Sequence, residues 1–358
     1  MNVRHAAVAS RRWLIPEVVQ TSAMDCGPAS LHALLRGFGL PSSYGRLREA
    51  CQTDIDGTSI DTIEDVANLL GLEAEQILLP ADWVVLPEAN VLPAVVVLRL
   101  ANGLTHFAVV WRRHGRWLQL MDPACGRRWV RDVDLVRELY VHHATVPAAD
   151  WAQWARSSEA RAMLAARLRA LGVRDAIALV DRAACASDWI ALARLDAATR
   201  VVNRLVDGRA LRRGADAEAV LGELIARDQQ GDAGTAIPEV YWSAWEAGND
   251  PESGPSVQVS GAVLVRVRGV KPPDRDSLQS LPELAAAAVE PEPRPIRTVL
   301  ELLESHGRVA RVGLVVVAAL TAAAMFVEVL LLRSLVDLSA QLGLSYDRER
   351  RRRTYTNI

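Results

Sequence analysis

Four residues in the first third of the chain have side chains suited to thiol-dependent acyl transfer. In chain order they are Gln20, Cys26, His106 and Asp122. A thiolate attacks a carbonyl, an imidazole takes and returns the proton, a carboxylate orients the imidazole, and an amide donates to the developing oxyanion. The four residue types in this order therefore predict the chemistry of a cysteine endopeptidase, with Cys26 as the nucleophile.

The sequence that follows Cys26 predicts a helix beginning close to this residue. Proline is tolerated in the first turn of a helix, and Pro28 fits that position. The apolar residues after it recur at helical spacing, as Leu31, Leu34, Leu35 and Phe38. A thiol at a helix N-terminus has a lowered pKa. Gln20 is near enough in the chain to place its amide beside the same thiol.

His106 and Asp122 are expected on neighbouring strands. Segments 104–111 and 116–121 have strand-like sequences. A three-residue loop centred on His114 pairs His106 with Asp122 and puts both side chains on one face of the sheet. A slip of one residue would put them on opposite faces. Taken singly, each candidate has a plainer explanation, as a small core cysteine, a structural histidine or an aspartate in a turn.

Helices precede strands in this part of the chain, which predicts an α+β fold. Segment 59–70 has a capping serine and helical spacing, and segment 44–52 is a shorter helix candidate. Segment 93–100 is an apolar run typical of a strand buried on both faces. The cysteine helix is therefore expected to face a mainly antiparallel sheet that carries the histidine and the aspartate.

Residues 16–147 resemble the bacteriocin-processing, papain-like cysteine peptidase domain found at the N-terminus of peptidase-containing ABC exporters. Short motifs spread over the whole stretch carry the resemblance: Val19-Gln20, Asp25-Cys26-Gly27-Pro28-Ala29, Asp56-Gly57-Thr58-Ser59, Gly71-Leu72, Thr105-His106-Phe107, Asp122-Pro123 and Gly126-Arg127-Arg128. The resemblance implies Cys26 as nucleophile, His106 as general base, Asp122 as its orienter and Gln20 as oxyanion donor.

The resemblance also implies a substrate and partners. Such domains cleave a leader from a precursor peptide after a Gly-Gly or similar small-residue pair, and their transporter exports the product. A dimer, or a complex with the membrane and ATPase parts of an ABC transporter, is expected. The alternative is a module that binds leader peptides for export without productive cleavage. The other cysteines share no metal-ligand spacing, so no cofactor or metal is expected.

The remaining chain divides by composition. Residues 1–15 form an N-terminal arm without a secretory signal. Residues 148–271 are mainly helical, with strand-like alternation at 257–268. This region is either a plain insertion or a module that docks a leader or a partner. Residues 272–296 are rich in proline and indicate a linker, 297–338 resemble the start of an exporter membrane domain, and 339–358 form a basic tail.

The segment 312–332 is long and apolar enough to span a bilayer. Arg308 and Arg311 precede it and favour its N-terminal side inside. The expected location is therefore a bacterial inner membrane, with the peptidase domain in the cytoplasm. The net charge of −2 does not indicate a nucleic-acid partner.

The sequence holds one spanning segment and no GxxxxGK[ST] loop. The basic run 348–353 would then lie outside, against the positive-inside rule. A truncated or frame-shifted exporter explains this conflict. The alternative is a one-helix protein whose tail stays in the cytoplasm.

Overall fold

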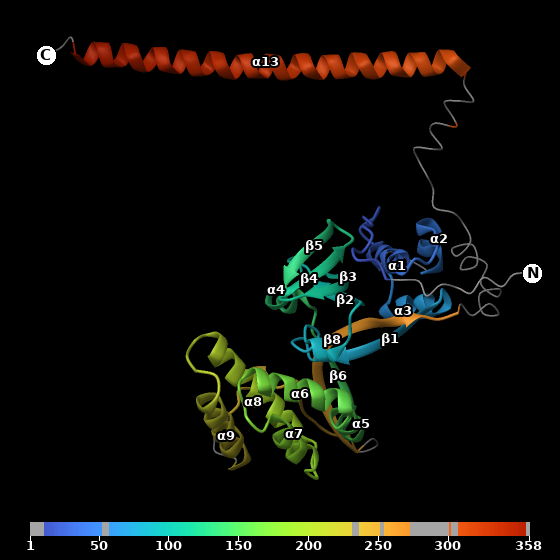
Figure 1. Cartoon of the computed structure of the whole chain (residues 1–358), viewed down its shortest axis with the longest axis vertical. Helices are drawn as coiled ribbons and strands as arrows, with labels where there is room; N and C mark the ends of the chain where they lie inside the picture. Colours follow the sequence, from blue (N-terminus) through green and yellow to red (C-terminus); the bar gives the residue numbers. More distant parts are fainter. Residues whose placement is uncertain are drawn as a thin grey trace, which may run out of the picture. The chain divides into compact units, whose positions relative to one another are not determined.

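The computed structural model describes residues 11–51, 57–230, 236–250, 254–272, 301 and 307–355. The chain forms two compact units, Met1–Glu292 and Pro293–Ile358. Apart from residue 272, the expected linker at 272–296 lies outside the described residues. The motif residue Asp56 also lies outside them. Figure 1 labels most of the elements of the two units.

The first unit begins with three helices and continues with a sheet, as the α+β prediction requires. The helices are α1 (Cys26–Gly37), α2 (Tyr44–Ala50) and α3 (Ile60–Leu69). The strands and the following helix are β1 (Leu72–Leu79), β2 (Ala94–Arg99), β3 (Thr105–His114), β4 (Trp117–Asp122), β5 (Gly126–Arg131), α4 (Asp132–Glu138) and β6 (His142–Pro147). Ser59 caps α3 by accepting a hydrogen bond from the Thr62 backbone N–H at 3.1 Å.

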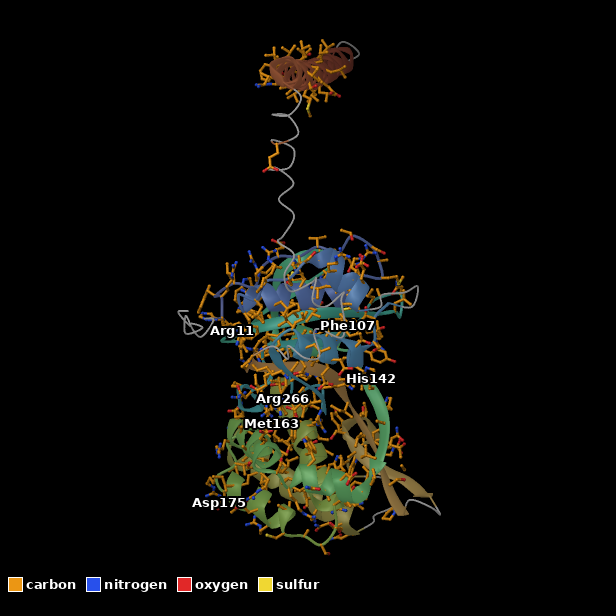
Figure 2. All side chains as sticks on the ribbon, turned by 90° about the vertical axis from the view of Figure 1, so that its right-hand side faces the viewer. Arg11, Phe107, His142, Met163, Asp175 and Arg266 are labelled. Carbon is orange, nitrogen blue, oxygen red and sulfur yellow. The ribbon has the colours of Figure 1, made fainter. Side chains whose placement is uncertain are left out.

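A helical group follows, and the chain then returns to the sheet. The group comprises α5 (Ala148–Ala155), α6 (Ser158–Ala170), α7 (Ala176–Ala184), α8 (Ile190–Asp207) and α9 (Ala215–Gln230), and the last strands are β7 (Ala244–Asp250) and β8 (Gly254–Val270). In Figure 2, Phe107 lies in the upper part of the first unit with the sheet, and Met163 and Asp175 lie in the helical part of that unit below.

Strand β8 occupies the middle of the sheet. The strand order is β1-β8-β2-β3-β4-β5, and every pairing is antiparallel. The second half of β8 pairs with β1 and β2, whereas its first half pairs with β6 and β7. Residues 254–270 therefore belong to the same sheet as His106 and Asp122, although the sequence analysis assigns them to the region after residue 147.

Two apolar cores lie on the two faces of this sheet. On one face, α1 packs Leu31, Leu34 and Leu35 against the sheet with no exposed surface. Burying one such leucine contributes about 1.5–3 kcal/mol. On the other face, Ala108, Val110 and Leu120 join a core that continues into the helical group. The helix residues in that core include Trp151, Met163, Leu168, Leu195 and Val202.

The second unit contains the helix α13 (Gly307–Tyr355). Its stretch Val315–Leu338 has a mean hydropathy of 2.5, and none of the stretch is buried within the structure. By length and composition it is the one described helix able to cross a membrane. It overlaps the segment 312–332 of the sequence analysis. The run 348–353 of the expected basic tail is helical.

Candidate active site

The hairpin of β3 and β4 brings His106 and Asp122 together, but its register differs from the expected one. Val110 pairs with Leu120 rather than with Leu118, and His114 pairs with Trp117 across a two-residue turn. The expected three-residue loop is therefore wrong. Gly115, at a φ of +59°, supplies the left-handed conformation that the shorter turn requires.

A β-bulge at Trp111 accounts for the rest of the difference. The register shifts between Val110 and Arg112, which leaves Trp111 as the extra residue. Its indole is fully buried beside Phe38, and its Nε1 donates to the Arg12 carbonyl at 3.1 Å. Near His106, the observed pairing of β3 with β4 differs from the expected pairing by two residues. A shift by an even number of residues keeps each side chain on the same face of the sheet. His106 and Asp122 therefore lie on one face as diagonal neighbours instead of as a direct pair.

The imidazole and the carboxylate form a buried hydrogen bond. His106 Nε2 lies 2.8 Å from Asp122 Oδ1, and the two residues are 4% and 7% exposed. The same carboxylate oxygen accepts the Ala124 backbone N–H at 3.0 Å. Arg128 lies 3.5 Å from the other oxygen. Burial opposes the charge on Asp122, but the hydrogen bonds from His106 and Ala124 and the charge of Arg128 outweigh it and lower the pKa of this carboxyl.

His106 is held in its protonated form. Burial of the ring opposes protonation, but hydrogen bonds to Asp122 and to Cys26, with the charges of both, raise the pKa of His106 to about 9. Because Nε2 faces Asp122, the remaining ring nitrogen, Nδ1, is the one that faces the thiol. At neutral pH the site therefore holds an imidazolium between a carboxylate and a cysteine.

Cys26 is the first residue of α1, as the position of Pro28 predicts, and its side chain is half-buried. The sulfur therefore lies at the positive end of the helix dipole. The helix packs against the sheet face opposite to that of His106. Cys26 meets His106 where β3 begins and β4 ends.

Asp25 fixes the loop that leads into α1. Its carboxylate is fully buried and accepts hydrogen bonds from Thr21 Oγ1 at 2.9 Å, Arg48 Nε at 2.9 Å and the Tyr44 hydroxyl at 3.3 Å. This network holds the turn before Cys26 against α2. This role of Asp25 is not visible in the sequence, because Arg48 is a long-range partner that no local pattern reveals.

Gln20 is tied to the same end of the sheet. Its backbone N–H donates to the Pro123 carbonyl at 2.9 Å, next to Asp122. Its side chain is half-buried, and Oε1 accepts no hydrogen bond among the described residues. The amide oxygen is thus not engaged by a structural partner. The oxyanion role expected of this residue would use the other end of the amide, Nε2, as the donor.

Arg128 and Glu138 support Asp122 from the side. Two hydrogen bonds of 3.3 and 2.6 Å join the guanidinium to the Glu138 carboxylate. Bidentate pairs of this kind hold a guanidinium in a defined plane. Arg128 belongs to a motif of the resemblance, but its contact with Asp122 emerges only from the pairing of β4 with β5.

The other cysteines do not join this site in the same way. Cys51 is buried, and burial raises the pKa of its thiol to about 12. Cys125 is exposed; partial burial and the neighbouring Asp122 raise the pKa of its thiol. Cys185 is exposed in the helical region. Within the described part of the chain, no group of His, Cys, Asp and Glu side chains is arranged to hold a metal ion.

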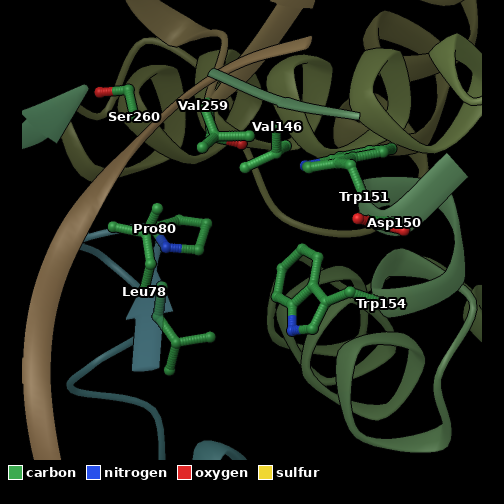
Figure 3. A pocket seen from close by; sticks show the side chains of 10 residues that line it. Leu78, Pro80, Val146, Asp150, Trp151, Trp154, Val259 and Ser260 are labelled. Atoms are coloured by element: carbon green, nitrogen blue, oxygen red, sulfur yellow. The ribbon is translucent and has the colours of Figure 1, made fainter. Parts of the chain in front are cut away.

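A separate apolar pocket lies between the helical group and the sheet. Its volume is about 200 Å³, and Trp151, Trp154, Leu78 and Pro80 are among the residues that line it (Figure 3). None of the four candidate site residues lines it. The reacting groups therefore lie outside this pocket, at the open ends of β3 and β4.

An α+β fold with a cysteine at the start of a helix, beside a histidine–aspartate pair on a sheet, defines a papain-like cysteine peptidase. Residues 15–140 match the model of the Peptidase C39 family, and the chain belongs to this family.

Relatives with and without a descriptive name match about a third of the chain. The lactococcin-G-processing and transport ATP-binding protein LagD of Lactococcus lactis is 30% identical over 112 residues, which cover 31% of this chain and 16% of LagD. An uncharacterized protein of Methanothermobacter thermautotrophicus is 30% identical over 115 residues, which cover 32% of this chain and 75% of that protein. The match thus spans a small part of LagD and most of the archaeal protein.

Two solved structures of peptidases are similar to about a third of the chain. The double glycine motif protease of an AMS/PCAT transporter, in complex with a leader peptide, is 22% identical and covers 37% of this chain and 89% of its own, at a TM-score of 0.31. The peptidase domain of Streptococcus ComA is 25% identical and covers 35% of this chain and 92% of its own, at a TM-score of 0.32.

Proposed function

We propose that this chain is a cysteine endopeptidase that removes the leader from a precursor peptide, as part of a peptide-export system of a bacterial inner membrane. The observation that carries the proposal is the contact of the half-buried Cys26 with His106, together with the buried 2.8 Å hydrogen bond between His106 and Asp122. Membership of the Peptidase C39 family supports the chemistry. The names of LagD and of the AMS/PCAT protease support the substrate class.

In the proposed mechanism, the Cys26 thiolate attacks the scissile carbonyl carbon. The carbonyl oxygen gains the negative charge and accepts a hydrogen bond from the Gln20 amide. The His106 imidazolium gives its proton to the leaving amine as the C–N bond breaks, which leaves an acyl-enzyme on Cys26. His106, now neutral, takes a proton from water, and the resulting hydroxide attacks the thioester carbon. Release of the acid restores the thiolate and the imidazolium.

Exposed apolar side chains flank these groups and suit an extended peptide. Val19 and Met24 lie beside Gln20 and Cys26 in the chain and are 56% and 39% exposed. Leu104 precedes His106 by two residues and is 61% exposed. Apolar residues of a leader can cover these side chains. The small residues at the cut are proposed from the double-glycine specificity named for the relatives.

The helix α13 is proposed to span the membrane with the peptidase unit on its cytoplasmic side. Partner subunits with further membrane helices and an ATPase would supply export. Residues 16–147 together with β8 are proposed as the catalytic unit, because β8 supplies the strand between β1 and β2. The helical group between β6 and β7 is then an insertion into that unit.

The test uses the full chain in nanodiscs and a synthetic precursor with a Gly-Gly pair. The wild type is expected to cut after the pair, and Cys26→Ala is expected to abolish cutting. Cys185→Ala, which removes an exposed thiol elsewhere, is the matched control and should retain activity. A precursor with Leu-Leu in place of Gly-Gly should resist cleavage. Tight binding by the wild type without cleavage would instead identify a leader-recognition module.

A further inference from the structure

Three exposed tryptophans gather on one side of the first unit, on the same sheet face that α1 partly covers. Trp13 is 62% exposed, Trp117 is 49% exposed and Trp129 is 42% exposed. Leu14, beside Trp13, is 41% exposed. Large apolar side chains that gather on a surface mark an interaction site more often than scattered ones do. We define the Trp–Arg face as Trp13, Leu14, Arg112, Trp117, Trp129 and Arg131.

The strand register makes this face continuous. Gln119 pairs with Arg112 on one side and with Trp129 on the other, and Trp117 pairs with Arg131. Paired residues and residues two positions apart share a face of the sheet. All of these side chains therefore emerge from one face.

The N-terminal segment, residues 13–15, lies over Gln119 in the middle of the face. The Ile15 backbone N–H donates to Gln119 Oε1 at 2.9 Å, which holds the segment over the sheet. The Arg112 guanidinium stacks 4.3 Å from the centre of the Trp13 ring. Trp13 thus joins the same surface as Trp117 and Trp129. The stacked pair presents an aromatic ring and a cation together.

The face lies in a positive part of a weakly negative chain. Segments 11–17, 112–117 and 127–134 contain eight arginines and three carboxylates, whereas the whole chain has a net charge of −2. The acidic side chains in these segments are Glu17, Asp132 and Asp134. Of the eight arginines, Arg113 and Arg128 pair with Leu118 and Leu120 and so lie on the other face, where Arg128 binds Glu138. Arg131 binds Asp134. The remaining arginines leave a positive excess around the tryptophans.

Tryptophan and arginine together suit one kind of surface, the interface of an anionic lipid bilayer. The indole places an apolar body and a polar N–H at the level of the headgroups. Each arginine near an anionic leaflet is attracted by the negative surface potential of the lipid headgroups. We infer that the Trp–Arg face rests on the anionic surface of the membrane. This inference depends on the proposal that α13 spans that membrane.

The chain keeps the face within reach of the lipid. Residues 271–306 connect β8 to α13, and 36 residues span at most about 130 Å when fully extended. Docking also leaves the active site open. Asp122 is five residues beyond Trp117 on β4, which corresponds to about 17 Å along the strand. A peptide can therefore enter at the far ends of the strands.

Tryptophan fluorescence tests the inference in the full chain. All ten tryptophans lie at or before residue 245, so none belongs to α13. The chain is placed in nanodiscs of brominated lipid, either anionic or zwitterionic, and co-elution with the discs establishes that α13 is inserted. In anionic discs the bromines should quench a share of the emission that corresponds to three of the ten tryptophans. In zwitterionic discs, or in high salt, this quenching should fall by more than half.

The decisive variant keeps every tryptophan and reverses charge on the face. Arg112→Glu with Arg131→Glu should lose most of the quenching in anionic discs. Arg169→Glu with Arg212→Glu, an equal change at two exposed arginines of the helical region, should retain it. Equal quenching of the two double variants would overturn the inference. So would the absence of quenching of the wild type in both lipids, and that result would instead indicate that this face binds a protein partner. The measurement does not depend on cleavage, so it stands apart from the peptidase proposal.

Discussion

Replacing Asp122 by asparagine removes the charge that holds His106 protonated while keeping the shape of the side chain. The rise in the pKa of His106 from 6.5 to about 9 corresponds to about 3 kcal/mol in favour of the imidazolium. Cys26 and Asp122 share that stabilisation. If Asp122 supplies about half of it, its loss costs about 1.5 kcal/mol, which is about tenfold in kcat/KM.

The assay is the dependence of kcat/KM on pH with a soluble Gly-Gly precursor peptide. The leaving amine needs the imidazolium, so activity should fall as the pH rises through the pKa of His106. In the wild type this alkaline limb is expected near pH 9. In Asp122→Asn the limb should move down by about one pH unit, in addition to the lower plateau.

Asp134→Asn is the matched control, because Asp134 pairs with Arg131 and Arg137 at the surface and does not contact His106. Its profile should coincide with that of the wild type. An Asp122→Asn profile with an unchanged alkaline limb and an unchanged plateau would refute the assignment of Asp122. A lower plateau with an unmoved limb would show that Asp122 orients the ring without setting its pKa.

Three further predictions concern the thiol, the sheet and one glycine. Iodoacetamide at neutral pH should label Cys26 faster than the other three cysteines. Cys51 should react slowest, because it is buried and burial raises the pKa of its thiol to about 12. Equal labelling rates at all four cysteines would exclude an activated thiolate at Cys26. A fragment that ends at residue 147 should aggregate and should not unfold cooperatively in a urea titration, because β1 and β2 lose the strand β8 that lies between them. A fragment that ends at residue 272 keeps β8 and should unfold as a folded domain. Cooperative unfolding of the shorter fragment would contradict the role of β8. Gly37→Ala should lower the free energy of unfolding by about 1–3 kcal/mol, because the new Cβ would lie 2.5 Å from the buried Trp111 ring. The control is Gly45→Ala, whose Cβ would have no neighbour within 4 Å and which should be neutral or stabilising. Equal stabilities of the two variants would show that the Trp111 ring can move aside.

The stability of the site should also depend on pH in a defined direction. The folded-state pKa of His106 is above its ordinary value of 6.5, so its contribution to the free energy of unfolding is complete below pH 6.5 and is lost as the pH rises through about 9. Chemical denaturation between pH 6 and 10 measures this loss. The loss should shrink in Asp122→Asn; the same loss in both proteins would assign it to other groups.

Patterns of neighbouring residues were enough to predict the local elements. The helix that begins at Cys26 follows from Pro28 and the apolar spacing after it, and the cap of α3 follows from Ser59. The α+β class follows from the order of these elements. Each of these features depends on contacts within one turn or one strand, so the sequence is sufficient to reveal it. The grouping of His106 with Asp122 on one face was predicted as well, although through a wrong register.

Contacts between distant segments were decided only by the tertiary structure. The bulge at Trp111 depends on burying an indole beneath the N-terminal segment, and no strand pattern signals it. The place of β8 between β1 and β2 depends on pairing with two strands that lie more than 150 residues earlier in the chain. The support of Asp25 by Arg48 depends on the packing of two helices. Periodicity records which side of an element is buried but does not record its partner, because many partners can bury the same apolar side, and only the whole packed chain selects one.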